Sequence, residues 1–136
     1  MPRDNGTVTL VQIVQLVVTI ALAAAFIFMG VNHFVPARAK GMAAMIPPWL
    51  KGTGWRSGKS LVRITGVCEI AGGVGLLIPW THVAAAICLA VFLVAVFPAN
   101  AYAAANRERF GRAAFPLVPR LIAQLVLIAL LIFVAV

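Results

Sequence analysis

The sequence predicts an all-α integral membrane protein, folded as a four-helix bundle in a single domain over residues 1–136. Three observations support this prediction. Hydrophobic residues make up 63% of the chain, whereas soluble domains average about 45–50%. Acidic residues number only three. Long apolar runs alternate with short basic connections, and a chain of this length has room for about four short spans and little else.

We expect the spans at about residues 8–31, 61–78, 82–97 and 117–136. The first run is too long to be the core of a secretion signal. Ser60 is a candidate N-cap for the second, and Pro79 ends it. The segment "IPWTH" then joins the second and third spans so tightly that they must be antiparallel neighbours.

Two longer connections differ in character. The first contains "GMAAMIPPWL", which is apolar but too short to cross a bilayer and is interrupted by Pro47 and Pro48. It is therefore expected to be an interfacial or re-entrant segment, with Trp49 at the level of the headgroups. The second begins "PANAYAAA", and its alanine content predicts that the third helix continues beyond the bilayer.

Positive charge is concentrated on one side of the predicted bundle. Of the 11 Lys and Arg residues, all but Arg3 fall in the two long connections or at their edges: Arg38, Lys40, Lys51, Arg56, Lys59, Arg63, Arg107, Arg109, Arg112 and Arg120. The positive-inside rule places both connections in the cytoplasm and both termini outside. The same rule explains the basic net charge, so membrane lipids rather than nucleic acid are the expected partners.

Glu69 lies well inside the second predicted span, where an unpaired carboxylate costs several kcal/mol. With the helical period, Thr65, Gly66 and Gly73 share its face. The glycines leave room for a neighbouring helix or for a ligand. The expected cross-helix partners of Glu69 are His33 and Arg120, in either a functional site or a structural ion pair.

Other polar residues lie at the same predicted depth. Asn32 and His33 end the first span, Asn100 follows the third, and Arg120 and Gln124 open the fourth. This asymmetry predicts a polar pocket in the cytoplasmic half of the bundle. Each residue also has a simpler structural interpretation: His33 as an interfacial histidine, Arg120 as a snorkelling residue and Asn100 as a cap at a kink.

Several kinds of redox or metal site are not expected. Cys68 and Cys88 lie at depths too different for a disulfide. His33 and His82 lie at opposite ends of the bundle, so they cannot hold haem from both sides. One histidine and one glutamate are too few for a metal site, and no flavin or nucleotide motif is present.

The motifs "GVNHF", "MIPPWL", "ITGVCEIAGGVGLLIP", "FPANAYAA" and "PRLIAQ" resemble, in order and spacing, the DoxX family of small bacterial membrane proteins. The resemblance covers nearly the whole chain and implies a four-helix membrane bundle. Members are associated with thiosulfate:quinone oxidoreductase, with a complex acting against oxidative stress, and with resistance to catechols and quinones. By resemblance the motif positions are Asn32, His33, Pro48, Glu69, Gly73, Pro98, Asn100 and Arg120.

Our leading hypothesis is a quinone-associated redox or detoxification subunit with Glu69 and His33 as its catalytic residues. Glu69 would exchange protons, and His33, Asn100 or Arg120 would form hydrogen bonds with the oxygens of the quinone. The ligand-binding residues would be Asn32, Asn100, Arg120, Gln124, Pro48 and Trp49. Since the chain has no soluble redox domain, a soluble partner protein would supply electrons. One alternative is a non-enzymatic protein that binds or transports a lipid or small molecule. Four spans are few for alternating access, so a transporter would be expected to form a homodimer. Another is a membrane scaffold for soluble enzymes.

Overall fold

The computed structural model describes residues 8–105 and 117–136, and every regular element in this part of the chain is a helix. Four of the helical segments are long and apolar enough to cross a membrane: Leu10–Asn32, Gly58–Leu77, His82–Ala99 and Val118–Ala135. The predicted all-α fold with four spans is therefore confirmed.

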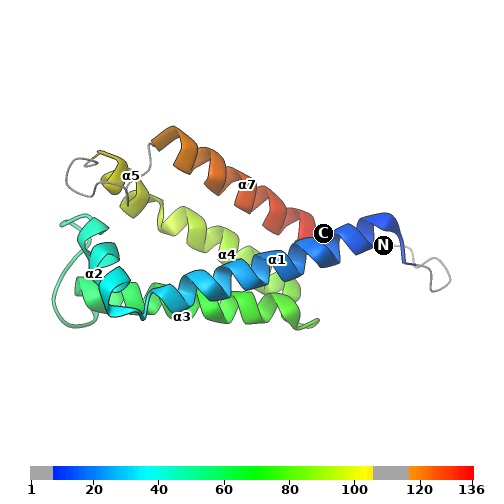
Figure 1. The fold of residues 1–136 in the computed structure, drawn as a ribbon, viewed down its shortest axis with the longest axis horizontal. Helices are drawn as coiled ribbons and strands as arrows, with labels where there is room; N and C mark the ends of the chain where they lie inside the picture. Colours follow the sequence, from blue (N-terminus) through cyan, green and yellow to red (C-terminus); the bar gives the residue numbers. More distant parts are fainter. Residues whose placement is uncertain (1–7, 106–116) are drawn as a thin grey trace.

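The four long helices pack in a ring (Figure 1). Helix α1 (Leu10–Asn32) packs along α3 (Gly58–Leu77), α3 packs on α4 (His82–Ala95), and α4 packs on α7 (Leu117–Ala135), which returns to α1. Side chains from all four fill the centre, and the most completely buried include Leu76, Leu89 and Leu131. Most of the other large apolar side chains of these helices point outward, as expected of helices that face lipid.

Helix α1 is fixed near its start by polar contacts. Thr9 and Gln12 form a reciprocal capping box, which satisfies backbone donors that the first turn leaves free. One turn deeper, Gln15 Nε2 donates a hydrogen bond to the Phe133 carbonyl of α7 at 2.9 Å. Gln15 therefore connects the start of α1 with the end of α7.

Helix α3 begins three residues earlier than predicted. Its N-cap is Ser57, whose side chain accepts a hydrogen bond from the backbone N–H of Ser60 at 3.2 Å. The expectation that Ser60 caps the helix is therefore wrong. Ser60 already lies in the first turn, because Gly58 and Lys59 continue the helix into the basic connection.

Glycines bring α1 and α3 into close contact. A Cβ atom on Gly66 would lie 2.7 Å from the Cβ of His33, and one on Gly30 would lie 2.8 Å from the Gly66 carbonyl oxygen. On Gly73 it would lie 3.0 Å from the carbonyl oxygen of Ala23. The predicted glycine face is therefore covered by α1, which occupies the space that these missing side chains leave.

The connections add short helices at one end of the bundle. Helix α2 (Pro36–Met45) has proline at its N-terminus and, at ten residues, is too short to span a bilayer. It lies across the end of α3 rather than along it (Figure 1), and it starts earlier than the apolar stretch that the sequence suggested. A 3₁₀ turn, η1 (Gly54–Arg56), precedes α3. Helix α5 (Phe97–Ala105) continues the third span after an interruption at Val96.

Candidate functional site: a buried histidine–glutamate pair

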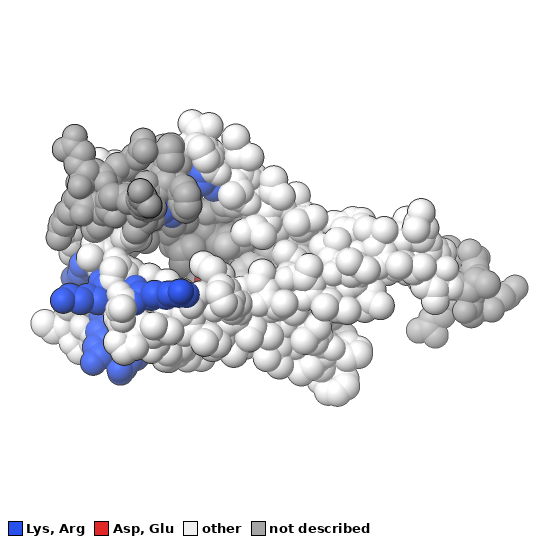
Figure 2. All heavy atoms as spheres, in the orientation of Figure 1, with Lys and Arg blue, Asp and Glu red and all other residues white. Residues whose placement is uncertain are grey.

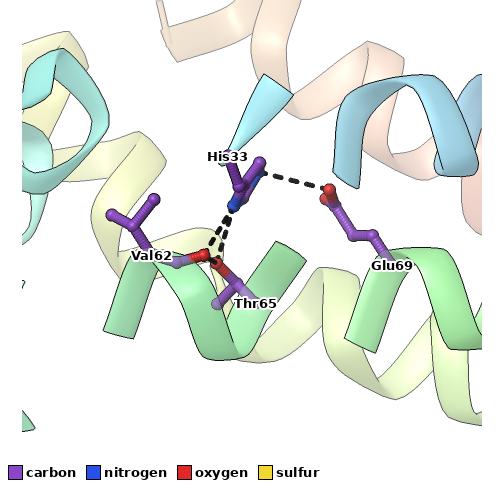
Figure 3. A network of polar contacts seen from close by, with 4 residues as sticks. All are labelled: His33, Val62, Thr65 and Glu69. Atoms are coloured by element: carbon purple, nitrogen blue, oxygen red, sulfur yellow. Dashed lines mark hydrogen bonds and ion pairs between the residues drawn. The ribbon is translucent and has the colours of Figure 1, made fainter. Parts of the chain in front are cut away.

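His33 is the residue at which α1 ends. Its backbone N–H still bonds to the carbonyl oxygens of the last helical turn, while its side chain extends to α3 (Figure 3). There, Nδ1 lies 2.9 Å from the Val62 carbonyl oxygen and 2.9 Å from Thr65 Oγ1. The imidazole is thus held against α3 by a backbone group and a hydroxyl group.

These contacts indicate which ring nitrogen of His33 carries a proton. A backbone carbonyl only accepts hydrogen bonds, so the short contact with Val62 requires an N–H at Nδ1. The hydroxyl of Thr65 itself donates to the same Val62 carbonyl at 2.8 Å, which leaves its oxygen free to accept from Nδ1. With a proton on Nδ1, the His33 ring, the Thr65 hydroxyl and the Val62 carbonyl all form hydrogen bonds. An unprotonated Nδ1 would instead place its lone pair against those of the Val62 carbonyl.

The opposite ring nitrogen faces Glu69. His33 Nε2 lies 3.2 Å from Glu69 Oε2, so the predicted contact between these two residues is confirmed. Glu69 is 9% exposed, and Oε2 has no hydrogen-bond partner among the described residues. The carboxyl group is therefore almost fully shielded from solvent. The imidazole of His33 lies at ion-pair distance from it.

This arrangement requires a proton between the two side chains. With Nδ1 protonated, a neutral His33 presents a lone pair at Nε2, and an ionised Glu69 would oppose it with a second lone pair. The repulsion is removed if Glu69 is a carboxylic acid or if His33 is an imidazolium. In both states the pair as a whole holds one transferable proton at a buried position.

Arg38 joins this site from α2, and it was not among the residues predicted to form it. Its Nη1 donates to Oδ1 of Asn32, the buried residue next to His33. Arg38 itself lies on the surface, so its side chain links solvent to the buried site. The sequence offered little indication of this contact. Arg38 follows Pro36 at the start of α2, and its side chain can contact Asn32 only because the chain turns sharply at residues 33–35.

The remaining predicted site residues are distributed over the same end of the molecule. On α7, Gln124 is buried and Arg120 half-buried, one turn apart. The backbone of Asn100 belongs to α5, but its side chain lies outside the described part of the structure. Pro48 and Trp49 are exposed in the turn after α2, so the structure does not bring them to the His33–Glu69 pair.

The Lys and Arg residues that the structure describes gather at the end of the molecule that carries α2 (Figure 2). The described ends of the chain, the start of α1 and the end of α7, lie toward the opposite end (Figure 1). The charge asymmetry predicted from the sequence is therefore present along the bundle axis.

The structure contains no other candidate of comparable chemistry within residues 8–105 and 117–136. This part of the chain has no cluster of three His, Cys, Asp or Glu residues that could hold a metal ion. Cys68 and Cys88 are both free and exposed. His82 packs far from His33, with Nδ1 2.8 Å from the Leu76 carbonyl oxygen and Nε2 2.7 Å from that of Val134.

No curated protein and no solved structure matches the chain. A family profile described as a domain of unknown function, DUF8561, matches residues 22–135. The match covers His33, Glu69 and every other residue considered for the site, as well as all of the helices except the start of α1. The chain therefore belongs to the DUF8561 family.

Proposed function

We propose that this protein is a quinone-associated subunit of a redox or detoxification system in a bacterial inner membrane, similar to the DoxX family. The observation that carries the proposal is the His33–Glu69 pair, which holds a transferable proton at a buried position between two spanning helices. Quinone reduction consumes two electrons and two protons, so a membrane site for it needs a proton donor of this kind. Both long basic connections would face the cytoplasm.

The residues of the site fit a ligand whose oxygens accept hydrogen bonds. Asn32, Gln124 and Arg120 carry N–H donors, and the pair supplies a further donor through its shared proton. Apart from the His33 ring at 3.2 Å, Glu69 Oε2 is buried with no hydrogen-bond partner among the described residues, so it is the atom at which a ligand would gain most from contact. Since α1 covers the glycine face of α3, the ligand would approach Glu69 from the side that does not face α1.

In this function a soluble redox partner would supply the electrons that reduce a bound quinone. The His33–Glu69 pair donates its proton to a ligand oxygen and is reprotonated from the basic end of the bundle. A second cycle of the pair provides the second proton. His33 keeps its orientation throughout, since its contacts with Val62 and Thr65 do not involve Nε2.

The close contact of α1 and α3 favours one alternative. If no ligand reaches Glu69, the pair is a structural lock between the two helices, and the protein is a membrane scaffold for soluble enzymes. Glu69→Gln would then alter the packing of the bundle without removing any bound ligand.

The first experiment identifies small molecules that copurify with the protein in mild detergent, by extraction and mass spectrometry. Wild type is compared with Glu69→Gln, which keeps the size of the side chain but holds no exchangeable acid proton. The matched control is Thr19→Val, a change at a buried polar residue of α1 whose hydroxyl donates to the Gln15 carbonyl at 2.7 Å. A quinone present in wild type and control but lost in Glu69→Gln supports the proposal. Absence of quinone from the wild type, or equal retention by Glu69→Gln, contradicts it and favours the lock.

A further inference from the structure

We propose that residues 36–63, here called the platform, bind the headgroups of anionic phospholipids. The platform comprises α2, the turn after it, η1 and the start of α3. It carries six cationic side chains and no acidic residue: Arg38, Lys40, Lys51, Arg56, Lys59 and Arg63. All of these except the half-exposed Lys51 are exposed.

The platform combines this charge with exposed aromatic side chains. Trp49 and Trp55 are each 70% exposed, a costly position for so large an apolar surface in water. Tryptophan is favoured at the membrane–water boundary, where its ring packs among headgroups and its N–H stays hydrated. Cationic side chains near the same boundary are attracted to anionic lipids. The two residue types therefore favour the same environment.

The platform also has a fixed shape. After α2, the backbone N–H of Leu50 bonds to the Pro47 carbonyl at 3.0 Å, and that of Gly52 bonds to the Arg56 carbonyl at 2.9 Å. At Gly54 the backbone takes a positive φ of 64°, which glycine adopts without strain. The connection between α2 and α3 is therefore an ordered turn that presents its cations in a defined arrangement.

Its position relative to the spanning helices favours lipid over a soluble partner. Figure 1 shows α2 lying across the end of the bundle, which is the orientation of a helix in the plane of the membrane surface. Figure 2 shows the Lys and Arg side chains at this same end, next to spanning helices whose large apolar side chains are exposed. In a bilayer that covers the spanning helices, cations at this end would lie beside lipid phosphates, and Trp49 and Trp55 would lie at the same level.

The test measures lipid retention by the full chain. Delipidated protein in mild detergent is incubated with equal amounts of phosphatidylglycerol and phosphatidylcholine that carry the same acyl chains, separated by gel filtration and analysed by mass spectrometry. The wild type should retain phosphatidylglycerol over phosphatidylcholine by about tenfold, since each cation close to an anionic headgroup adds to the preference. Equal retention of the two lipids by the wild type would overturn the proposal.

Two triple variants with the same loss of net charge separate the platform from a general effect of charge. The platform variant replaces exposed cations that make no contact with the His33–Glu69 site: Lys40→Gln, Arg56→Gln and Lys59→Gln. The control replaces cations of the second connection: Arg107→Gln, Arg109→Gln and Arg112→Gln. The platform variant should lose most of the tenfold preference, and the control should stay within about twofold of the wild type. Equal losses in both variants would assign the preference to net charge and would also overturn the proposal.

Discussion

His33 Nε2 lies 3.2 Å from Glu69 Oε2, across the closest part of the interface between α1 and α3. The other side of the imidazole is fixed by Val62 and Thr65, which belong to the same helix as Glu69. One helix therefore sets both the protonation pattern of the ring and the position of its acidic partner. This relationship makes the pair a unit, and the first two predictions follow from it.

Comparing Glu69→Ala with Glu69→Gln should show whether hydrogen bonding or the ionised carboxylate stabilises the site. Glu69→Ala removes the group that faces His33 Nε2 and leaves a buried ring nitrogen unpaired, so we expect a loss of about 1–3 kcal/mol in unfolding free energy. Glu69→Gln can still donate an amide N–H to Nε2, and it should lose less than about 1 kcal/mol. Thermal unfolding in detergent provides the comparison. A Glu69→Gln protein as unstable as Glu69→Ala would show that the ionised carboxylate, and not hydrogen bonding, stabilises the site.

The protonation pattern of His33 can be observed directly by ¹⁵N NMR of histidine-labelled protein. We expect Nδ1 to be protonated, either in the neutral ring or in an imidazolium, because it faces a carbonyl that can only accept. The Nε2 resonance should change in Glu69→Gln, while that of Nδ1 should change little. His82 is the internal reference, since it lies near the opposite end and should be unaffected. A neutral ring protonated only at Nε2 would disprove the assignment.

Alanine substitutions at Gly66 and Gly41 test how closely α1 and α3 must approach, with Gly41 as the control. A methyl group at Gly66 would lie 2.7 Å from the His33 Cβ, whereas Gly41 has no atom within 4 Å of such a group. Gly66→Ala should therefore destabilise the protein by about 1–3 kcal/mol and move His33 away from Glu69. Gly41→Ala, in a helix interior, should be neutral or stabilising by about 1 kcal/mol. Unfolding midpoints report both effects, and equal midpoints would refute the close approach.

Much of this architecture could be predicted because it is encoded locally. The four spans follow from long apolar runs, and the face that Gly66, Glu69 and Gly73 share follows from the helical period. The partner of Glu69 could be predicted because few polar residues lie at its depth. His33 was therefore one of two candidates, and the structure confirms the contact.

Other features depend on contacts distant in the sequence, and local patterns did not reveal them. The hydrogen bond from Arg38 to Asn32 forms because the chain turns sharply after His33 and α2 starts at Pro36. The local sequence does not predict the direction of that turn. Pro48, a motif position by resemblance, and its neighbour Trp49 were expected to bind the ligand, yet they lie on the surface. Ser57 rather than Ser60 caps α3, because helix starts vary by a few residues where several serines and glycines are available.

The last prediction concerns the opposite end of the bundle, where two side chains hold the end of α7. Gln15 Nε2 donates to the Phe133 carbonyl, and His82 Nε2 lies 2.7 Å from the Val134 carbonyl. These carbonyls belong to the last turn of a helix and have no intrahelical partner. Each side chain can therefore satisfy a carbonyl oxygen that the helix itself leaves without a partner.

We expect Gln15→Ala and His82→Ala each to cost about 1 kcal/mol, because a neutral imidazole has one N–H and donates to the Val134 or the Leu76 carbonyl but not to both. Hydrogen exchange should accelerate at the end of α7 in both variants and stay unchanged around His33. Since the two side chains contact neighbouring carbonyls, the double variant should lose less than the sum of the single losses once the last turn has frayed. Strict additivity, with no faster exchange at the end of α7, would mean that the two contacts stabilise α1 and α4 and do not hold α7.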